Sequence, residues 1–382
     1  MTDTHDATTA PPSGAPGFFR RHAVKLVASV VITASILYAL EKGGLKLWPE
    51  GGNFKQIRWW TVPAYVVTMI AMSYYRAVRW RFLLRSFVEI PRRRIVAVSW
   101  IGFAAILLLP FRIGEIVRPV MIREKGKVSA TAATGTVVAE RIVDGLYLSI
   151  VLAIALLTVP TLDPLPDAVV GIPVSVHKVR LSGFVMLGVF VVAFTVIAVF
   201  YFARNFAQRA TLAVFGLVSK SLADKLAGTA SKLAEGLHFL GRARDAVPFV
   251  LETTAYWGLN VFGMWMLAWG CGVVHADGSS ITLGETCALM GMLGVTVLIP
   301  GPPGLLGVFQ AGIYAAMTMY FPTEVVVGQG AAYVFLLYSL QVAWTLLAGA
   351  LALVGNQNAL SVLSEAKDDS ENDAPPKADP IT

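Results

Sequence analysis

The sequence predicts an all-α polytopic membrane protein, and three observations support this fold class. Of the 382 residues, 56% are hydrophobic and only 14% are charged, whereas a soluble domain carries about 25% charged residues. Several apolar runs reach the ~17 residues that a helix needs to cross the hydrocarbon core. Basic residues gather in particular loops, as the positive-inside rule requires. We expect about six full transmembrane helices and two re-entrant helical hairpins.

The two ends of the chain are expected to be disordered tails around one membrane domain. Residues 1–17 are polar and rich in Thr, Ala and Pro, a composition that cannot form a core. The apolar run that follows has no small-residue cleavage site after it, so it reads as a retained first span at 24–40 rather than a signal peptide. The transmembrane domain is expected at 18–355, and 356–382 is a disordered acidic tail.

The second span, 59–76, leads into a strongly basic segment. Seven arginines and one glutamate lie in 76–94, which indicates a cytoplasmic position. Trp80, Leu83 and Leu84 alternate with these arginines, a pattern typical of an amphipathic helix in the membrane interface. The simplest role for these arginines is to set the orientation of the protein in the membrane and to attract anionic lipid.

The next apolar stretch, 95–109, has only 15 residues before Pro110. A full crossing here would place the basic cluster of 116–128 outside, against the positive-inside rule. A re-entrant hairpin that enters from the cytoplasm and returns keeps this cluster inside. Irregular backbone at that depth requires cover by protein or a wet cavity.

The third span lies within 130–159 and is expected to begin near 136–140. Its purely apolar part after Asp144 has only about 15 residues, so the span needs the residues before it. This places Glu140, Arg141 and Asp144 at or just below the cytoplasmic interface. The later spans are expected at 181–203, 248–270 and 326–354, with 160–177 and 271–283 outside and the basic loop 204–247 in the cytoplasm.

A second hairpin is expected where two apolar segments, 284–299 and 305–320, flank the sequence IPGPPGLLGVFQ. The neighbouring loops contain no Lys or Arg, so this hairpin enters from outside and returns there. Its break resembles that of the first hairpin. Two hairpins from opposite faces are typical of an inverted repeat whose broken helices meet near the membrane midplane. Both termini are then cytoplasmic.

Arg112, Glu115 and Arg118 follow the first break directly and are the first candidate site. Ionisable groups at membrane depth are costly and mark functional sites by default. The planar donor fork of arginine suits phosphate, and free N–H groups of a helix that starts after Pro110 or Pro303 would add to anion binding. The alternative is that Glu115 and Arg118, three residues apart on one face, simply neutralise each other.

Glu140, Arg141 and Asp144 form the second polar group. Two carboxylates near an arginine either bind a cation or relay a proton, or they clamp Arg112 or Arg118 as internal salt bridges. The two readings are left open.

The second hairpin opens with prolines and glycines, among them Pro303, Gly304 and Gly307. These residues either allow close backbone approach or only end a helix. Gln310 is the first polar side chain after them, and it hydrogen-bonds either to a headgroup or to a neighbouring helix.

The sequence lacks the motifs of several enzyme classes. There is no phosphate-binding loop, no nucleophile elbow and no dinucleotide fingerprint. The five histidines are scattered and there are only two cysteines, so we expect no metal and no cofactor. The net charge of +7 reflects topology rather than nucleic-acid binding. The largest cytoplasmic loop, 204–247, is too short for a soluble catalytic domain.

The motifs FRIGEIVRP, AERIVDG and PGPPGLLGVFQ resemble a flippase-like integral membrane family, related to the transmembrane region of lysylphosphatidylglycerol synthases. The resemblance covers about 25–350. It assigns the family's polar motif positions to Arg112, Gly114, Glu115, Arg118, Glu140, Arg141 and Asp144, and those of the second hairpin to Gly304 and Gly307. Relatives often have an acidic residue where Gln310 stands. The synthases add a soluble aminoacyl-transfer domain that is not seen here, so the resemblance implies lipid translocation rather than synthesis.

The resulting hypothesis is a bacterial inner-membrane protein that translocates a lipid with a polar or anionic headgroup. Arg112 and Arg118 would bind the headgroup, Glu140, Arg141 and Asp144 would gate or counterbalance it, and the second hairpin would close the site. One alternative is a membrane-embedded lipid or glycolipid transferase, or an accessory subunit of a lipid-modifying enzyme. Another is a non-catalytic scaffold. The expected partner is a phospholipid or another lipid with a polar headgroup, within the membrane, and homo-oligomerisation stays open.

Overall fold

The structure, a computed structural model, is all-helical over the residues that it describes, which confirms the predicted fold class. Apart from a few isolated positions, it describes residues 48–109, 114–123, 128–168, 175–203, 241–297 and 303–355. The predicted first span at 24–40, most of the loop 204–247 and both predicted tails lie outside these residues.

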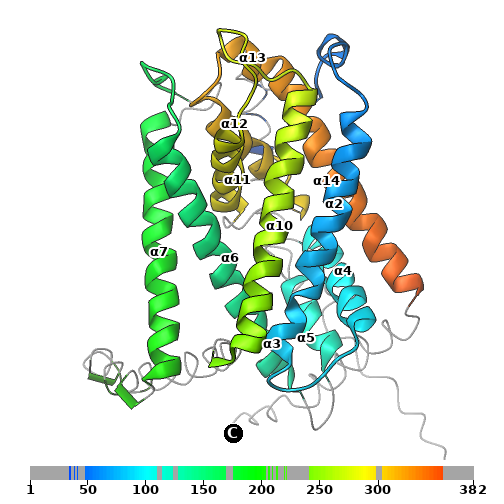
Figure 1. Cartoon of the computed structure of the whole chain (residues 1–382), viewed down its shortest axis with the longest axis vertical. Helices are drawn as coiled ribbons and strands as arrows, with labels where there is room; N and C mark the ends of the chain where they lie inside the picture. The colour runs from blue at the N-terminus through cyan, green and yellow to red at the C-terminus, as the bar shows by residue number, and fades with distance from the viewer. Residues whose placement is uncertain are drawn as a thin grey trace, which may run out of the picture.

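Five long helices run side by side along the long axis of the molecule (Figure 1). They are α2 (Thr61–Val78), α6 (Ala130–Thr158), α7 (Val176–Phe202), α10 (Ala243–Gly270) and α14 (Gln329–Val354). Among the described residues, three stretches are long and apolar enough to cross a membrane: Ala130–Thr158, Val176–Val196 and Thr323–Val354. The last includes the short helix α13 (Thr323–Val327). The protein is therefore a multi-pass α-helical membrane protein.

The shorter helices form two hairpins in opposite halves of the molecule. The first consists of α4 (Arg92–Leu108) and α5 (Val117–Ile122). The second consists of α11 (Leu283–Val297), the 3-10 turn η4 (Pro303–Leu305) and α12 (Val308–Met317). Figure 1 shows the first pair in the lower half and the second pair in the upper half. This arrangement agrees with the two predicted hairpins entering from opposite faces, although the break residues 110–113 and 298–302 lie outside the described residues.

The structure corrects the reading of the basic segment 76–94. The apolar side chains of its helix, α3 (Trp80–Leu84), do not face lipid as an amphipathic interfacial helix requires, because Trp80, Leu83 and Leu84 are fully buried within the protein. The arginine that precedes it, Arg79, is fully buried as well. The sequence pattern failed here because alternation of arginine with apolar residues fits a helix that pairs its charges inside the protein as well as one that lies on lipid.

The start of the third span is also corrected. Helix α6 begins at Ala130, not near 136–140, and Ser129 caps it by accepting a hydrogen bond from the Ala132 N–H at 3.1 Å. Because a helix rises about 1.5 Å per residue, Glu140 lies roughly three turns inside α6. Glu140 and Asp144 are therefore buried inside the protein.

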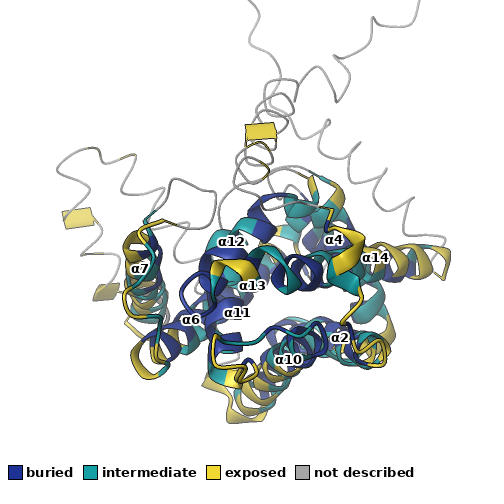
Figure 2. Ribbon diagram, turned by 90° about the horizontal axis from the view of Figure 1, so that it is seen from above, coloured by how far each residue is buried: buried dark blue, intermediate teal, exposed yellow. Residues whose placement is uncertain are grey.

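Small residues let the helices pack closely. A Cβ added at Gly270 of α10 would overlap Thr61 of α2, and one added at Gly291 of α11 would overlap Leu152 of α6. Close approach of this kind is the usual basis of helix association in membranes. Seen from above, buried residues gather between the helices, whereas α7 and α14 carry much of the exposed surface at opposite edges (Figure 2).

Candidate functional site

A cavity of about 240 Å³ lies between the two hairpins. The end of α4 contributes Ile106 and Leu107, the end of α11 contributes Val295 and Val297, and the turn of the second hairpin contributes Gly304. Helices α2, α6, α7, α10 and α14 complete its wall. The described ends of both hairpins therefore border one shared space, which we call the central cavity.

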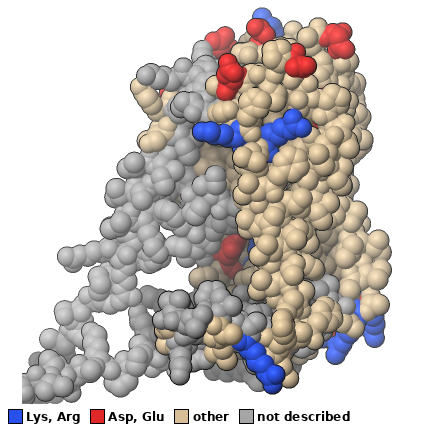
Figure 3. All heavy atoms as spheres, turned by 90° about the vertical axis from the view of Figure 1, so that its left-hand side faces the viewer, with Lys and Arg blue, Asp and Glu red and all other residues tan. Residues whose placement is uncertain are grey.

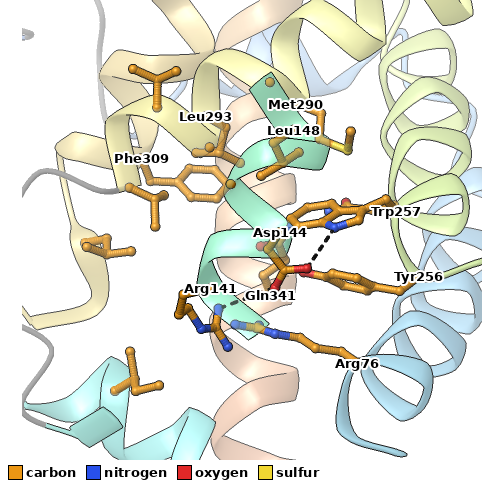
Figure 4. Close-up of a pocket in the computed structure, with 18 of the residues that line it drawn as sticks. Arg76, Arg141, Asp144, Leu148, Tyr256, Trp257, Met290, Leu293, Phe309 and Gln341 are labelled. Atoms are coloured by element: carbon orange, nitrogen blue, oxygen red, sulfur yellow. Dashed lines mark hydrogen bonds and ion pairs between the residues drawn. The ribbon is translucent and has the colours of Figure 1, made fainter. Parts of the chain in front are cut away.

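The central cavity has a polar end and an apolar end (Figure 4). Arg76 of α2 points into the same region as Arg141 and Asp144 of α6. Phe309 and Leu293, from the second hairpin, lie toward the other end. Such a division suits a ligand with one charged part and one apolar part.

Behind the polar end, a buried ion-pair network ties Asp144 to Arg79. The two terminal nitrogens of Arg79 donate to both carboxylate oxygens of Asp144, each at 2.6 Å. Arg79 also donates to the Thr253 hydroxyl at 3.0 Å, and Trp257 Nε1 donates to Asp144 at 3.3 Å. A bidentate arginine–carboxylate pair is among the strongest and most directional polar contacts in proteins.

Glu140 accepts hydrogen bonds from three arginines in the same network. Arg79 donates to its Oε1 at 3.2 Å, Arg141 to its Oε1 at 3.1 Å, and Arg118 to its Oε2 at 3.1 Å. Glu140, Arg79 and Arg118 are fully buried. The two carboxylates thus clamp arginines, as one of the two sequence readings proposed, but the main partner of Asp144 is Arg79 rather than Arg112 or Arg118.

The polar cluster carries an excess of positive charge. Arg76, Arg79, Arg118 and Arg141 contribute four guanidinium groups, and Glu140 and Asp144 contribute two carboxylates. Glu115 also acts electrostatically on Arg141, and the excess persists when its charge is included. Within the described residues Arg76 has no ion-pair partner, and its guanidinium stacks at 4.1 Å from the Phe103 ring centre.

The Arg118 side chain packs against two aromatic rings and occupies space that a glycine leaves open. Its guanidinium lies 4.2 Å from the Trp80 ring centre and 5.1 Å from that of Phe103. A Cβ added at Gly102 would overlap the Cγ of Arg118, so only glycine leaves room for this side chain. Two nitrogens of Arg118, Nε and one terminal nitrogen, have no hydrogen-bond acceptor among the described residues.

Gly114 and the second hairpin contribute backbone geometry. A Cβ at Gly114 would overlap the backbone of Ala105, so this glycine lets the two arms of the first hairpin touch. Gly304 and Gly307 have φ of +70° and +85°, values that favour glycine. The Tyr338 hydroxyl donates to the carbonyl of Gly304 at 3.0 Å, which ties the turn to α14.

Gln310 has a local role. It is buried, and its Oε1 accepts a hydrogen bond from the Gly307 N–H at 2.7 Å, which caps the start of α12. It is not among the described residues that line the central cavity. The side-chain oxygen of Gln310 thus bonds within its own hairpin, whereas the sequence left a headgroup or a neighbouring helix as the partner of Gln310.

The structure brings some predicted site residues together and separates others. Arg141, Asp144 and Gly304 line the central cavity, whereas Arg118 and Glu140 lie in the network behind it. Arg112 lies outside the described residues. Pro303 opens the turn η4, and Glu115 lies at the start of the return arm of the first hairpin. Among the described residues, no group of three or more His, Cys, Asp or Glu is arranged to hold a metal ion.

Sequence reasoning missed Arg76 and Arg79 as site residues. Both occur in the basic segment 76–94, and their charges were assigned to topology. One signal was present: they fall at the end of an apolar span, three residues apart on one helical face, which differs from the RRR run at 92–94.

Comparison with known proteins identifies the family. Residues 26–354 match the family described as the lysylphosphatidylglycerol synthase TM region. Because this match covers most of the chain, the protein belongs to that family. It is a membrane-embedded protein related to lipid modification or translocation. No curated protein and no solved structure gave a significant match.

Proposed function

We propose that this member of the lysylphosphatidylglycerol synthase TM region family translocates a lipid with an anionic headgroup across the bilayer. The observation that carries the proposal is the central cavity, where Arg76 and Arg141 face a space bordered by the described ends of both hairpins. In this proposal the headgroup enters the polar end, and the acyl chains stay in the surrounding lipid.

The charge balance supports an anion as ligand. Asp144 is the acidic residue among the described cavity-lining side chains, and Arg79 already binds both of its oxygens. A cationic headgroup would therefore meet two arginines and no free carboxylate from these residues. A phosphate would supply acceptors for guanidinium donors that have none, which offsets part of the cost of keeping them inside the membrane.

The location of the cavity supports transport. Discontinuous helices that meet near the midplane are a recurring design of transporters, because movement of one repeat exposes the site to alternate faces. Here α4 and α11 both end at the central cavity, and they belong to hairpins in opposite halves of the molecule.

The distribution of surface charge supports an orientation. On the face shown in Figure 3, acidic side chains gather at the upper end, and Lys and Arg dominate the lower end, with a further basic group on the upper flank. By the positive-inside rule the lower end, which holds the first hairpin, is cytoplasmic. We place the protein in the bacterial inner membrane with both termini on the cytoplasmic side.

The proposal is tested by reconstitution into liposomes with fluorescent-headgroup phospholipids of anionic and zwitterionic type, followed by a leaflet-accessibility assay. Wild type is expected to move the anionic lipid faster. Arg76→Gln is expected to slow this transfer about tenfold or more, since a hydrogen bond to a charged group contributes roughly 1.5–3 kcal/mol. Arg58→Gln is the matched control, because Arg58 also stacks on an aromatic ring, that of Trp269, but lies outside the cavity.

Two results would count against this function. If folded wild-type protein moves no lipid, the transferase and scaffold alternatives gain. If Arg76→Gln transfers the anionic lipid at the wild-type rate, the central cavity is not the headgroup site.

A further inference from the structure

The loop between α10 and α11 places a histidine against the outer end of the second hairpin, the end that the proposed orientation puts outside. This loop lies in the upper part of the molecule, away from the first hairpin (Figure 1). The Nε2 atom of His275 is 2.6 Å from Oε1 of Glu285, in the first turn of α11. The same ring packs against that of Phe321, shortly after the end of α12, with ring centres 4.8 Å apart. His275 therefore contacts both arms of the hairpin at their outer ends.

Both nitrogens of the His275 ring face oxygens that accept hydrogen bonds. Nδ1 lies 3.1 Å from the carbonyl oxygen of Ser279, and Nε2 faces the carboxyl group of Glu285. A neutral imidazole has one donor nitrogen and one acceptor nitrogen, whereas a protonated ring donates from both. Beside a charged Glu285, either neutral form would therefore point a ring lone pair at an oxygen lone pair. The arrangement fits a pair that holds one proton more than a neutral imidazole and a carboxylate.

The Ser279 hydroxyl does not replace this proton. It lies 3.1 Å from Nδ1 of His275, but it donates to Oδ1 of Asp277 at 2.6 Å, and a hydroxyl has a single proton to donate. Asp277 also accepts the Ser279 N–H at 2.9 Å. These hydrogen bonds from Ser279 lower the pKa of Asp277. A second carboxylate near His275 is therefore negative over the range in which histidine titrates.

The other charged and titratable groups around the pair come from two elements. From α7, Arg180 donates to the Leu156 carbonyl at 3.2 Å. From the segment after α12, Tyr320 is buried, and both Glu285 and Arg180 act on it electrostatically. Among the described residues, His275 is the ion-pair partner of Glu285, whose side chain is only 6% exposed. Loss of the extra proton therefore leaves a buried carboxylate without a cationic partner in this part of the chain.

Glu285 also fixes the start of α11. Its Oε2 accepts a hydrogen bond from the Thr282 N–H at 2.7 Å, and its own N–H donates to the Thr282 hydroxyl at 3.3 Å, a reciprocal cap of the helix start. One carboxyl group thus caps α11 and binds His275. The other end of α11 lines the central cavity through Val295 and Val297. A single helix therefore joins the pair to the cavity.

We infer that the protonated pair of His275 and Glu285 is a pH-dependent clasp that holds the outer end of the second hairpin closed. Histidine is the side chain that ordinarily changes charge between pH 5 and 8. Below this range the clasp is complete, and above it a ring lone pair faces an oxygen and the clasp weakens. The consequence for transport rests on the proposed function: the hairpin opens more readily at alkaline pH, and lipid transfer is faster there than at acidic pH.

Hydrogen exchange of the full-length protein in detergent tests the clasp without lipid movement. Wild type and His275→Gln are compared at the same pH, so that the chemical pH dependence of exchange cancels. The reporter is the Thr286 N–H, which donates to the Thr282 carbonyl at 3.1 Å at the start of α11. At pH 5.5 this N–H is expected to exchange about threefold faster in the variant, as befits a partly exposed ion pair. At pH 8.5 the two proteins are expected to exchange alike.

The liposome assay, with the same pH on both sides of the membrane, tests the effect on transport. Wild type is expected to move the fluorescent anionic phospholipid about threefold faster at pH 8.5 than at pH 5.5. His275→Gln is expected to move it at the faster rate at both pH values. Glu285→Gln, which keeps an oxygen for the helix cap and removes the charge, is expected to do the same. His177→Gln is the matched control, because His177 is exposed at the start of α7, and it is expected to keep the wild-type pH dependence.

The two measurements separate the clasp from the proposed function. Equal exchange of the Thr286 N–H in wild type and His275→Gln at pH 5.5 would overturn the inference. Lipid transfer by His275→Gln with the pH dependence of wild type would also overturn it, since another group would then set that dependence. Absence of lipid movement at both pH values would instead refute the proposed function, and the exchange result would still decide whether the clasp exists.

Discussion

The buried carboxylate of Glu140 offers the sharpest test of the ion-pair network. It accepts hydrogen bonds from Arg79, Arg118 and Arg141 at 3.1–3.2 Å, with no exposed surface. Glu140→Gln keeps the shape of the side chain but removes its charge. Arg79 retains Asp144, whereas Arg118 loses the one ion pair that the described residues give it. Breaking a buried pair in this way costs about 3–5 kcal/mol.

This cost appears as a lower midpoint of unfolding. At roughly 2–4 °C for each kcal/mol, Glu140→Gln is expected to lower the thermal midpoint by about 6–20 °C in detergent. Glu324→Gln is the matched control, because Glu324 is exposed at the opposite end of the molecule, in α13, and is expected to change stability by less than about 0.5 kcal/mol.

A double-mutant cycle separates the ion pair from general packing. Arg118→Met removes the unpaired charge and keeps an unbranched side chain, so Glu140→Gln/Arg118→Met is expected to be more stable than the sum of the two single effects by about 2–3 kcal/mol. Strictly additive effects, or a Glu140→Gln variant as stable as wild type, would refute the view that Glu140 is the counter-ion of Arg118.

Two further substitutions test the packing of the two hairpins. Gly102→Ala places a Cβ onto the Cγ of Arg118 and is expected to lower the free energy of unfolding by about 1–3 kcal/mol. Its control is Gly188→Ala in α7, where a Cβ meets nothing within 4 Å; this change is expected to be neutral or to stabilise by up to about 1 kcal/mol. Thermal unfolding compares the two variants. Gln310→Leu leaves the buried Gly307 N–H without its acceptor and is expected to lower the free energy of unfolding by about 1–3 kcal/mol. The control Gln329→Leu, at a partly exposed site, is expected to show no such loss in the same measurement.

The sequence predicted those features that depend on local pattern. The lengths of the apolar runs predicted the long helices and the two short hairpins, and the described ends of α4 and α11 next to the predicted breaks line the central cavity. Motif resemblance also selected Glu140, Arg141 and Asp144, which the structure places at one polar cluster. Pattern could not give their partners, because Arg79 meets Asp144 across 65 positions of sequence, and the packing of α2 against α10 and of α3 against α6 brings it there.

The same limit explains why two assignments went wrong. Counting arginines in 76–94 treats each charge as a solvated one, but Arg79 is buried while Arg92 and Arg93 are exposed. Gln310 appeared to be available for a ligand because it was the first polar group after the turn. Its side-chain oxygen instead accepts from the Gly307 N–H at the start of α12, because a helix start leaves backbone N–H groups without partners.

The network also bears on which hairpin moves. Arg118, on the return arm of the first hairpin, is joined to α6 by a fully buried ion pair, so displacement of this arm would separate two charges in a low-dielectric interior. Between the second hairpin and the long helices, the described contacts are mainly apolar or small-residue contacts, such as Gly291 on Leu152, with the hydrogen bond from Tyr338 to Gly304. Contacts of this kind change at a lower free-energy cost than a buried ion pair. If the central cavity opens to alternate faces, the second hairpin is therefore the less costly element to displace, and the first hairpin with its arginines is the fixed part of the site.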